Sequence, residues 1–191
     1  MTEIYYLTGR GGKLTEGLGE ALLHRGCDVS GREVSRDLFS LSFQEQVDLI
    51  SNDIEQFWST DSKIVAVSYG AYLLLHALMD KDSCPSNILL LSPILGGVND
   101  PGVMKFYRPP RANKLLDTVR AGKYPKLKQL QIHVGEHDWQ SIPDRGIEFS
   151  QAVGGRCIVI SEKGHLLGKN YVGRLLDQWL YGTSQTKQQS L

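Results

Sequence analysis

Cysteine is scarce in this chain of 191 residues, and neither sign of charge is in excess. The three cysteines, Cys27, Cys84 and Cys157, are far apart and form no CxxC pair. An odd, scattered set does not suit a disulfide framework or a zinc knuckle, so we predict reduced thiols and a cytoplasmic protein. Lys plus Arg and Asp plus Glu each number 21, which gives a formal net charge of zero. Such a surface offers no electrostatic footprint for nucleic acid or an anionic membrane, and we expect neither as a partner.

Long apolar runs and metal-binding motifs are also absent from the sequence. No segment approaches the roughly 20 apolar residues of a membrane helix. The N-terminus has no basic region followed by an apolar run, so we expect no signal peptide. There is no HExxH motif and no cluster of histidines, and we therefore expect no metal and no other cofactor. No heptad repeat is present either, so the sequence gives no indication of an oligomeric state.

The glycine-rich segment 9–12 does not fit the phosphate-binding loops of nucleotide enzymes. A P-loop through this segment would need glycine at Leu7 and serine or threonine at Leu14. A GxGxxG motif that starts at Gly9 would need glycine or alanine at Leu14. Both patterns fail, and the sequence therefore argues against nucleotide binding.

What the sequence does contain is a globular composition and a regular alternation of strands and helices. Hydrophobic residues make up 41% of the chain, with 20 glycines and 7 prolines, which suits a folded domain rather than a disordered or fibrous chain. Apolar runs predict buried strands at Ile4–Leu7, Ile64–Val67, Ile88–Leu91, Leu130–Val134 and Ile158–Ile160. The segment Val29–Val34 could form a further short strand, which Gly31 interrupts. Because these runs do not alternate with polar residues, both faces of the sheet are expected to be covered, as in a parallel sheet between helices.

Helices are predicted between these strands. The clearest covers 43–58, where apolar residues recur every three or four positions after a capping box of Ser42 and Glu45. Other helical patterns cover 14–22, 70–79, 112–121, 144–153 and 170–181. We therefore predict one doubly wound α/β domain over 1–182, with a mainly parallel sheet of about six strands and helices on both faces. The polar residues 183–191 are predicted to form a flexible tail.

The predicted strand 64–67 ends in a sequence that suits a nucleophile. The chain passes from this strand through Ser68 directly into a helix, so Ser68 stands at a tight turn. In a parallel α/β sheet, binding sites form beyond the carboxyl ends of the strands. The small residues Ala66 and Gly70, two before and two after Ser68, keep the neighbouring backbone clear of it. Taken alone, Ser68 could equally serve as the cap of the following helix.

Two later strands end near an acid and a base. The predicted strand 130–134 is followed by Asp138, and the predicted strand 158–160 is followed by His165. Taken alone, Asp138 could be a solvated loop acid or a helix cap, and His165 a loop histidine bonded to backbone. Three such residues, each at a strand end, favour a triad of Ser68, His165 and Asp138 over three coincidences.

These strand ends resemble motifs of the α/β-hydrolase family. The segment 66–70 is similar to the family's nucleophile elbow, with alanine for the first glycine of GxSxG, while 135–138 resembles its acid loop and 163–165 its Gly-His loop. The order Ser, Asp, His along the chain is also that of the family. The resemblance covers residues 3–182 and implies a small core version without the first hairpin or a large cap domain. Should Asp138 not be the acid, the fallback candidates are Glu136 and Asp144.

The resemblance further implies an oxyanion hole of two backbone N–H groups. One would belong to Tyr69, the residue after the nucleophile. The second would come from the loop after the first strand, where we choose Arg10. In this loop Thr8 replaces the histidine that is usual in the family, and Gly9 is predicted to contact the substrate.

The segment 96–128 is longer than an ordinary connection between strands, and such loops are usually functional or disordered. It carries four prolines and the apolar side chains Met104, Phe106 and Tyr107. We predict that these side chains bind the substrate by forming the roof of an acyl pocket over Ser68, with Trp139 as another wall, which would make the segment a small lid insert. The alternative is that they cover the edge of the sheet as a satellite core.

The sequence therefore predicts a serine hydrolase of the carboxylesterase type. Its substrate would be a small ester, thioester or related acyl compound, cleaved through a Ser-His-Asp triad and an acyl-enzyme. The alternative is a non-catalytic binding or regulatory protein on the same fold, because a fold does not fix a function. Labelling by a fluorophosphonate probe distinguishes the two.

Overall fold

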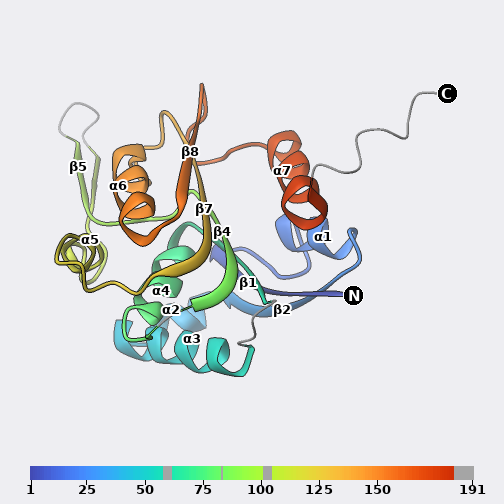
Figure 1. The fold of residues 1–191 in the computed structure, drawn as a ribbon, viewed down its shortest axis with the longest axis horizontal. Coiled ribbons are helices and arrows are strands. Elements are labelled where there is room, and N and C mark those ends of the chain that lie inside the picture. Colours follow the sequence, from blue (N-terminus) through green and yellow to red (C-terminus); the bar gives the residue numbers. More distant parts are fainter. Residues whose placement is uncertain (58–61, 83, 101–104, 183–191) are drawn as a thin grey trace.

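A six-stranded parallel sheet forms the centre of the computed structural model, which describes residues 1–57, 62–82, 84–100 and 105–182. The strand order is β2-β1-β3-β4-β7-β8, and every neighbouring pair is parallel (Figure 1). The strands are β1 (Thr2–Arg10), β2 (Cys27–Val34), β3 (Lys63–Val67), β4 (Cys84–Leu91), β7 (Leu127–Gly135) and β8 (Arg156–Ile160). The predicted parallel sheet of about six strands is confirmed.

Helices cover both faces of this sheet, as the continuous apolar strands predicted. The core on one face is built with α1 (Leu18–Leu23) and α7 (Lys169–Tyr181). The core on the other face is built with α2 (Arg36–Ser40), α3 (Phe43–Phe57), α4 (Ser68–Leu78), α5 (Lys114–Arg120) and α6 (Pro143–Val153). Within the described residues, no helix is both long and apolar enough to cross a membrane.

The capping box predicted for the longest helix is present at the start of α3. The N–H of Ser42 donates to Oε2 of Glu45 at 2.8 Å, and the N–H of Glu45 donates to Oγ of Ser42 at 3.3 Å. These bonds satisfy backbone donors that have no partner inside the helix. The apolar face of α3 then buries Ile50 and Ile54 completely. Trp58, at the end of the predicted pattern, lies outside the described residues.

The first helix is shorter than its apolar spacing predicted, because α1 begins at Leu18 rather than at Leu14. Gly17 has a φ of 57°, in the left-handed region that ends or delays a regular helix. A Cβ added to Gly19 would lie 1.9 Å from the carbonyl oxygen of Leu14. The chain therefore turns tightly on these two glycines before the helix begins.

The long segment 96–128 contains a hairpin and a helix. The hairpin pairs β5 (Val98–Asp100) with β6 (Lys105–Tyr107), and α5 follows it, which confirms the helix predicted at 112–121. Buried side chains of α5 join the core that also contains α4. Met104 and the predicted tail 183–191 lie outside the described residues, and the structure describes Phe106 only as a backbone position of β6.

Candidate active site

Ser68 is the first residue of α4 and follows β3 directly. Its φ of 51° lies in the left-handed region, which is unfavourable for a residue with a side chain and is often found at functional sites. A Cβ on Gly70 would lie only 2.2 Å from the carbonyl oxygen of Thr8, so this turn requires glycine there. The result is a tight strand-to-helix turn that leaves Ser68 half-buried at the carboxyl edge of the sheet.

The carboxyl end of β1 passes directly beside Ser68. The structure extends this strand past Thr8 and Gly9, which the sequence places in a loop. A Cβ on Gly9 would lie 3.6 Å from the Cβ of Ser68. The Oγ1 of Thr8 accepts a hydrogen bond from the N–H of Val34 at 2.9 Å and donates to the carbonyl of Gly12 at 3.3 Å. Through its hydroxyl group Thr8 therefore ties the end of β1 to β2 and to the turn that follows.

The two residues predicted to form an oxyanion hole both lie next to this turn. Tyr69 belongs to the first turn of α4, where backbone N–H groups have no partner inside the helix. Its hydroxyl group donates to Oε1 of Gln46 at 3.2 Å, which fixes the side chain away from the backbone N–H. Arg10 ends β1, and its guanidinium lies 4.8 Å from the ring centre of Phe39. The oxyanion role of both residues stays a prediction.

The loops after β7 and β8 pack against each other. The N–H of His137 donates to the carbonyl of Lys163 at 2.7 Å. A Cβ on Gly135 would lie 2.2 Å from the carbonyl oxygen of Gly164, so the two backbones approach more closely than any larger residue would allow. These contacts fix the loop that carries Asp138 relative to the loop that carries His165.

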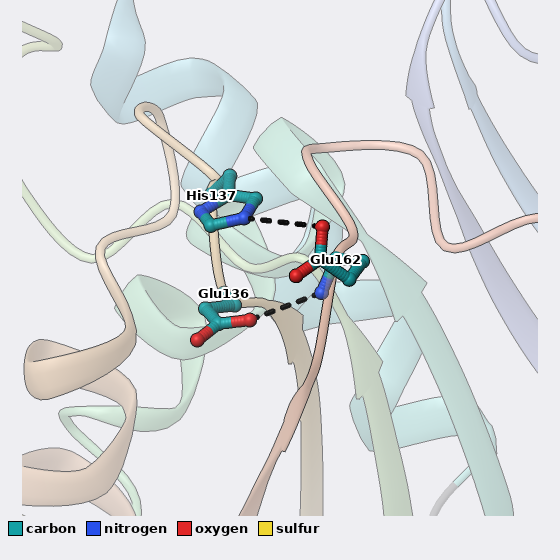
Figure 2. Close-up of side chains that lie close together, drawn as sticks. All are labelled: Glu136, His137 and Glu162. Carbon is teal, nitrogen blue, oxygen red and sulfur yellow. Dashed lines mark hydrogen bonds and ion pairs between the residues drawn. The ribbon is translucent and has the colours of Figure 1, made fainter.

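On the outer side of these loops, Glu136, His137 and Glu162 lie close together (Figure 2). Their ligand atoms are within 4.8 Å of one another, and all three residues are exposed. The donors could hold a divalent cation, but Oε2 of Glu136 already accepts hydrogen bonds from the N–H of Glu162 at 3.0 Å and from the hydroxyl of Ser161 at 2.9 Å. These two bonds lower the pKa of Glu136 and account for its orientation without a metal.

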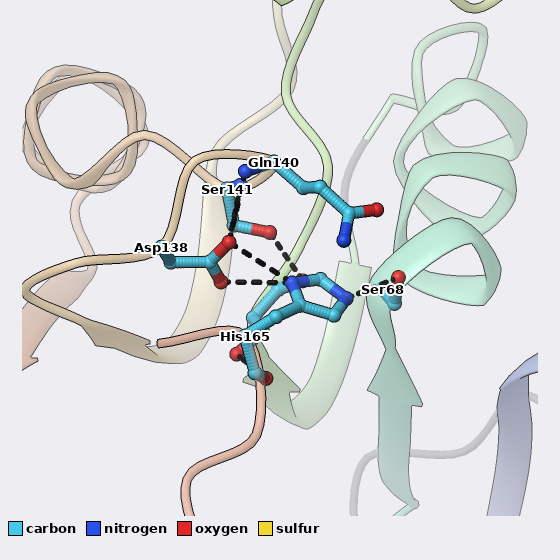
Figure 3. A network of polar contacts seen from close by, with 6 residues as sticks. Ser68, Asp138, Gln140, Ser141 and His165 are labelled. Atoms are coloured by element: carbon cyan, nitrogen blue, oxygen red, sulfur yellow. Dashed lines mark hydrogen bonds and ion pairs between the residues drawn. The ribbon is translucent and has the colours of Figure 1, made fainter. Parts of the chain in front are cut away.

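The side chains of Ser68, His165 and Asp138 form a continuous line of hydrogen-bond contacts (Figure 3). Oγ of Ser68 lies 2.9 Å from Nε2 of His165, and Nδ1 of His165 lies 2.8 Å from Oδ2 of Asp138. The Asp138 side chain is fully buried, while the His165 side chain is 22% exposed. The structure thus brings together the three residues that come from three separate strand ends, and the arrangement can accept a proton from the serine hydroxyl.

Asp138 is held by backbone groups as well as by His165. Its Oδ1 accepts hydrogen bonds from the N–H groups of Gln140 at 2.9 Å and Ser141 at 3.0 Å. Burial by itself would raise the pKa of Asp138, but the hydrogen bonds from His165, Ser141 and Gln140 outweigh burial and hold that pKa below its usual value. The buried carboxyl group is therefore charged at neutral pH, as an acid that faces an imidazole must be.

Two serines that were not assigned to the site from the sequence connect its parts. The hydroxyl of Ser92 donates to the carbonyl of His165 at 2.9 Å, and the hydroxyl of Ser141 donates to the carbonyl of Ser92 at 2.6 Å. Ser92 directly follows β4 and has a φ of 45°. From the sequence, Ser92 could have been noticed only because it follows a predicted strand and precedes Pro93. No motif marks it as a site residue.

The remaining candidates lie around this line of contacts without joining it. Neither Glu136 nor Asp144 is a hydrogen-bond partner of His165 in the described part of the chain, and Asp144 is exposed at the start of α6. Trp139 is half-buried next to Asp138. Tyr107 is half-buried against the core that contains α4. The pKa of Tyr69 is raised to about 12, mainly by burial and to a smaller extent by its electrostatic interaction with Tyr107. The predicted roof over Ser68 by these aromatic residues stays a prediction.

A cavity of about 620 Å³ lies beside His165, on the face of the sheet that carries α1 and α7. His165 and Ser92 are part of its wall. The aliphatic side chains in the wall are those of Leu18, Ala21, Val67, Leu91, Leu166, Leu167 and Val172. A mainly aliphatic cavity next to the proposed base was not predicted from the sequence.

Neither a protein-family model nor the sequence of a curated protein matches this chain at a significant level. Solved structures do match it. The ydeN gene product from B. subtilis is similar with a TM-score of 0.64 over 94% of this chain and 99% of that chain, at 13% sequence identity. The chain has the α/β-hydrolase fold.

Two further structures with this fold carry names that state an activity. A monoacylglycerol lipase from Paleococcus ferrophilus is similar with a TM-score of 0.58 over 93% of each chain, at 16% identity. The carboxylesterase CesB from Bacillus subtilis is similar with a TM-score of 0.59 over 95% of this chain and 84% of that chain, at 11% identity. At these identities the α/β-hydrolase fold is shared, and the activity of this chain has to be argued from its own site.

Proposed function

We propose that this protein is a serine hydrolase that cleaves a small ester, thioester or related acyl substrate. The observation that carries the proposal is the line of contacts from Oγ of Ser68 through the imidazole of His165 to the buried carboxylate of Asp138, with distances of 2.9 and 2.8 Å. A nucleophile, a base and a group that orients the base are the parts that covalent acyl transfer needs.

In the proposed reaction, Nε2 of His165 takes the proton of Ser68 while Oγ attacks the carbonyl carbon of the substrate. Asp138 keeps the proton on Nδ1 of His165 and stabilises the imidazolium that forms. The backbone N–H groups of Tyr69 and Arg10 hold the negative oxygen of the tetrahedral intermediate. The imidazolium then protonates the leaving group, and a water molecule, activated by the same imidazole, releases the acid from Ser68.

The substrate is proposed to lie across Ser68, with Gly9 close to its carbonyl group. Gly9 suits this position because a side chain there would approach Ser68 itself. Tyr107 and Trp139 are proposed to border the substrate on the side of α4 and the β5–β6 hairpin. Ester substrates are supported by the names of the carboxylesterase and the monoacylglycerol lipase with similar structures.

Labelling with a fluorophosphonate, followed by mapping of the labelled peptide, tests the proposal. We expect the label on Ser68, no labelling of the Ser68→Ala variant, and normal labelling of Ser40→Ala, which changes an exposed serine on α2. Hydrolysis of short p-nitrophenyl esters should follow the same pattern. A folded wild-type protein that neither reacts with the probe nor hydrolyses these esters would be a binding protein on the hydrolase fold instead.

A further inference from the structure

The cavity between α1 and α7 begins where the proposed chemistry takes place. Val67 and Leu91 end β3 and β4 and form part of its wall, and Ser68 and Ser92 are the residues that follow them. His165 lines the cavity with Ser92, and its Nε2 lies 2.9 Å from Oγ of Ser68. Ser68 itself is not part of the wall, so a group attached to a carbonyl carbon at Ser68 would enter this space by passing the imidazole.

The wall of the cavity is aliphatic, and its charged residues are at the rim. Leu18 and Ala21 of α1 face Leu167 and Val172 of the α7 side. Arg25 is the least exposed of these charged side chains. Its guanidinium donates hydrogen bonds to Asp177 and to backbone carbonyls of α1 and α7, so these donors are already paired within the protein. The remaining charged residues of the wall, Glu20 and Lys169, and also His24, are exposed. A volume of about 620 Å³ is within the usual range for small-molecule sites.

An exposed leucine stands at the same place. Leu166 follows His165 directly, belongs to the cavity wall and is 85% exposed. An apolar ligand in the cavity would cover part of this side chain and remove it from water, which is favourable.

We infer that this cavity receives the acyl chain of the substrate, and that the substrates are esters or thioesters of medium-length aliphatic acids. The inference rests on the proposed serine hydrolase function, because it places the carbonyl carbon at Ser68. The apolar chain then lies between α1 and α7, with its polar end at His165. The alcohol or thiol leaves on the opposite side, toward Tyr107 and Trp139.

Filling the cavity tests the inference through chain-length preference. The variant Ala21→Phe places a ring into the wall at a half-buried position of α1, and Val172→Phe does the same from α7. The matched control is Ala152→Phe, which changes an exposed alanine of α6 on the other face of the sheet. The measurement is kcat/KM on p-nitrophenyl esters from acetate to decanoate.

We expect the ratio of kcat/KM on decanoate to that on acetate to fall by about tenfold or more in Ala21→Phe and Val172→Phe. The same ratio should be unchanged in Ala152→Phe. An unchanged ratio in both cavity variants, with the fold intact by circular dichroism, overturns the inference.

Binding of decanoate to the Ser68→Ala protein, measured by calorimetry, separates this inference from the proposed function. We expect binding by Ser68→Ala and its loss in the Ser68→Ala, Ala21→Phe double variant. One outcome rejects the acyl-chain role of the cavity and retains the hydrolase function: the wild type is labelled by the fluorophosphonate, decanoate does not bind, and the chain-length preference of the cavity variants is unchanged. The opposite outcome rejects the hydrolase function and retains the cavity as a binding site for an apolar chain: decanoate binds, Ala21→Phe abolishes this binding, and Ser68 is not labelled.

Discussion

The hydroxyl group of Ser92 donates a hydrogen bond of 2.9 Å to the backbone carbonyl of His165, and this bond ties the turn after β4 to the loop that carries the imidazole. The carbonyl of Ser92 accepts a bond of 2.6 Å from Ser141, whose own N–H donates to Asp138 at 3.0 Å. The proposed base and the proposed acid are therefore positioned through the same two serines. This connection links the loop that carries Asp138 to the loop that carries His165.

Replacing Ser92 by alanine should lower kcat more than it changes KM. The carbonyl of His165 loses its described hydrogen-bond donor, and a small displacement of the imidazole is enough to cost about 10-fold to 100-fold in rate. Stability should fall by about 1 kcal/mol, because a partly buried carbonyl group loses its partner. Steady-state kinetics and urea denaturation measure the two effects, with Ser40→Ala as the surface control. Lost stability with an unchanged kcat would assign Ser92 a structural role alone.

Asp138→Asn should reduce kcat by about 10⁴-fold, the size of effect expected when the imidazole is held in the wrong tautomer. The fold should be retained, because asparagine has nearly the same shape. The control is Glu136→Gln, which removes an exposed carboxylate two positions earlier and should leave kcat within a factor of about two. If Glu136→Gln is the inactive variant, the acid role belongs to Glu136.

Gly135→Ala should destabilise the protein and reduce activity together. The new Cβ would lie 2.2 Å from the carbonyl oxygen of Gly164, and backbone cannot give way as a flexible side chain can. The Asp138 and His165 loops must then separate. Gly164→Ala in the facing loop is the matched control, since its nearest contact would be the carbonyl of His137 at 3.9 Å. We expect a loss of about 2–4 kcal/mol for Gly135→Ala and a small change for Gly164→Ala. Comparable losses in both would contradict the steric argument.

The stability of the protein should fall as the pH drops below about 6.5, because two buried histidines resist protonation. Burial lowers the pKa of His76 and of His133 from 6.5 to about 4. For His76 the nearby Arg111 and Lys114 lower the pKa further. The unfolded chain therefore binds protons below pH 6.5 that the folded chain takes up only near pH 4. Each histidine should cost roughly 3 kcal/mol of stability by the end of this range.

Urea denaturation at several pH values, repeated on His76→Phe, measures this effect. Phenylalanine suits the site because His76 packs edge-on against the rings of Phe43 and Tyr72. The stability of the variant should depend less on pH between 6.5 and 4 than that of the wild type, while the contribution of His133 remains. Parallel pH curves for the two proteins would show that His76 titrates normally.

Tyr107→Ala should change the preference for the leaving group more than the preference for acyl-chain length. Tyr107 lies near Tyr69 and Arg10, on the opposite side of the sheet from the α1–α7 cavity. A series of acetate esters with alcohols of increasing size, measured beside the acyl series, separates the two preferences. If the acyl series changes instead, Tyr107 forms the roof of the acyl pocket, as the lid interpretation of the segment 96–128 predicts.

The fold could be predicted from the sequence because the strands are buried on both faces. Runs such as Ile64–Val67 are continuous and apolar, and this pattern is typical of a central parallel strand. The elements that were missed, α2 and the β5–β6 hairpin, are short. A segment of three to five residues presents too few positions to show a period, and its structure is decided by the packing around it.

The same reasoning explains what could be predicted of the site. Ser68, Asp138 and His165 each follow a strand, and parallel strands bring their carboxyl ends to one edge of the sheet. Ser92 also follows a strand, but a lone serine has too many possible roles to be assigned. The α1–α7 cavity was not predictable, because its volume depends on how far two helices stand apart rather than on any local pattern.

The strand order has a consequence for how the proposed site would respond to heating. His165 is carried by the chain that leaves β8, a five-residue strand at the edge of the sheet in which no side chain is fully buried. Edge segments with few buried contacts detach at a lower free-energy cost than the centre of a domain. Local release of β8 would withdraw the imidazole from Ser68 while the core around β3 and α4 stays folded. Heat inactivation should therefore begin below the melting temperature of the core and reverse on cooling, because the last strand would detach before the core unfolds.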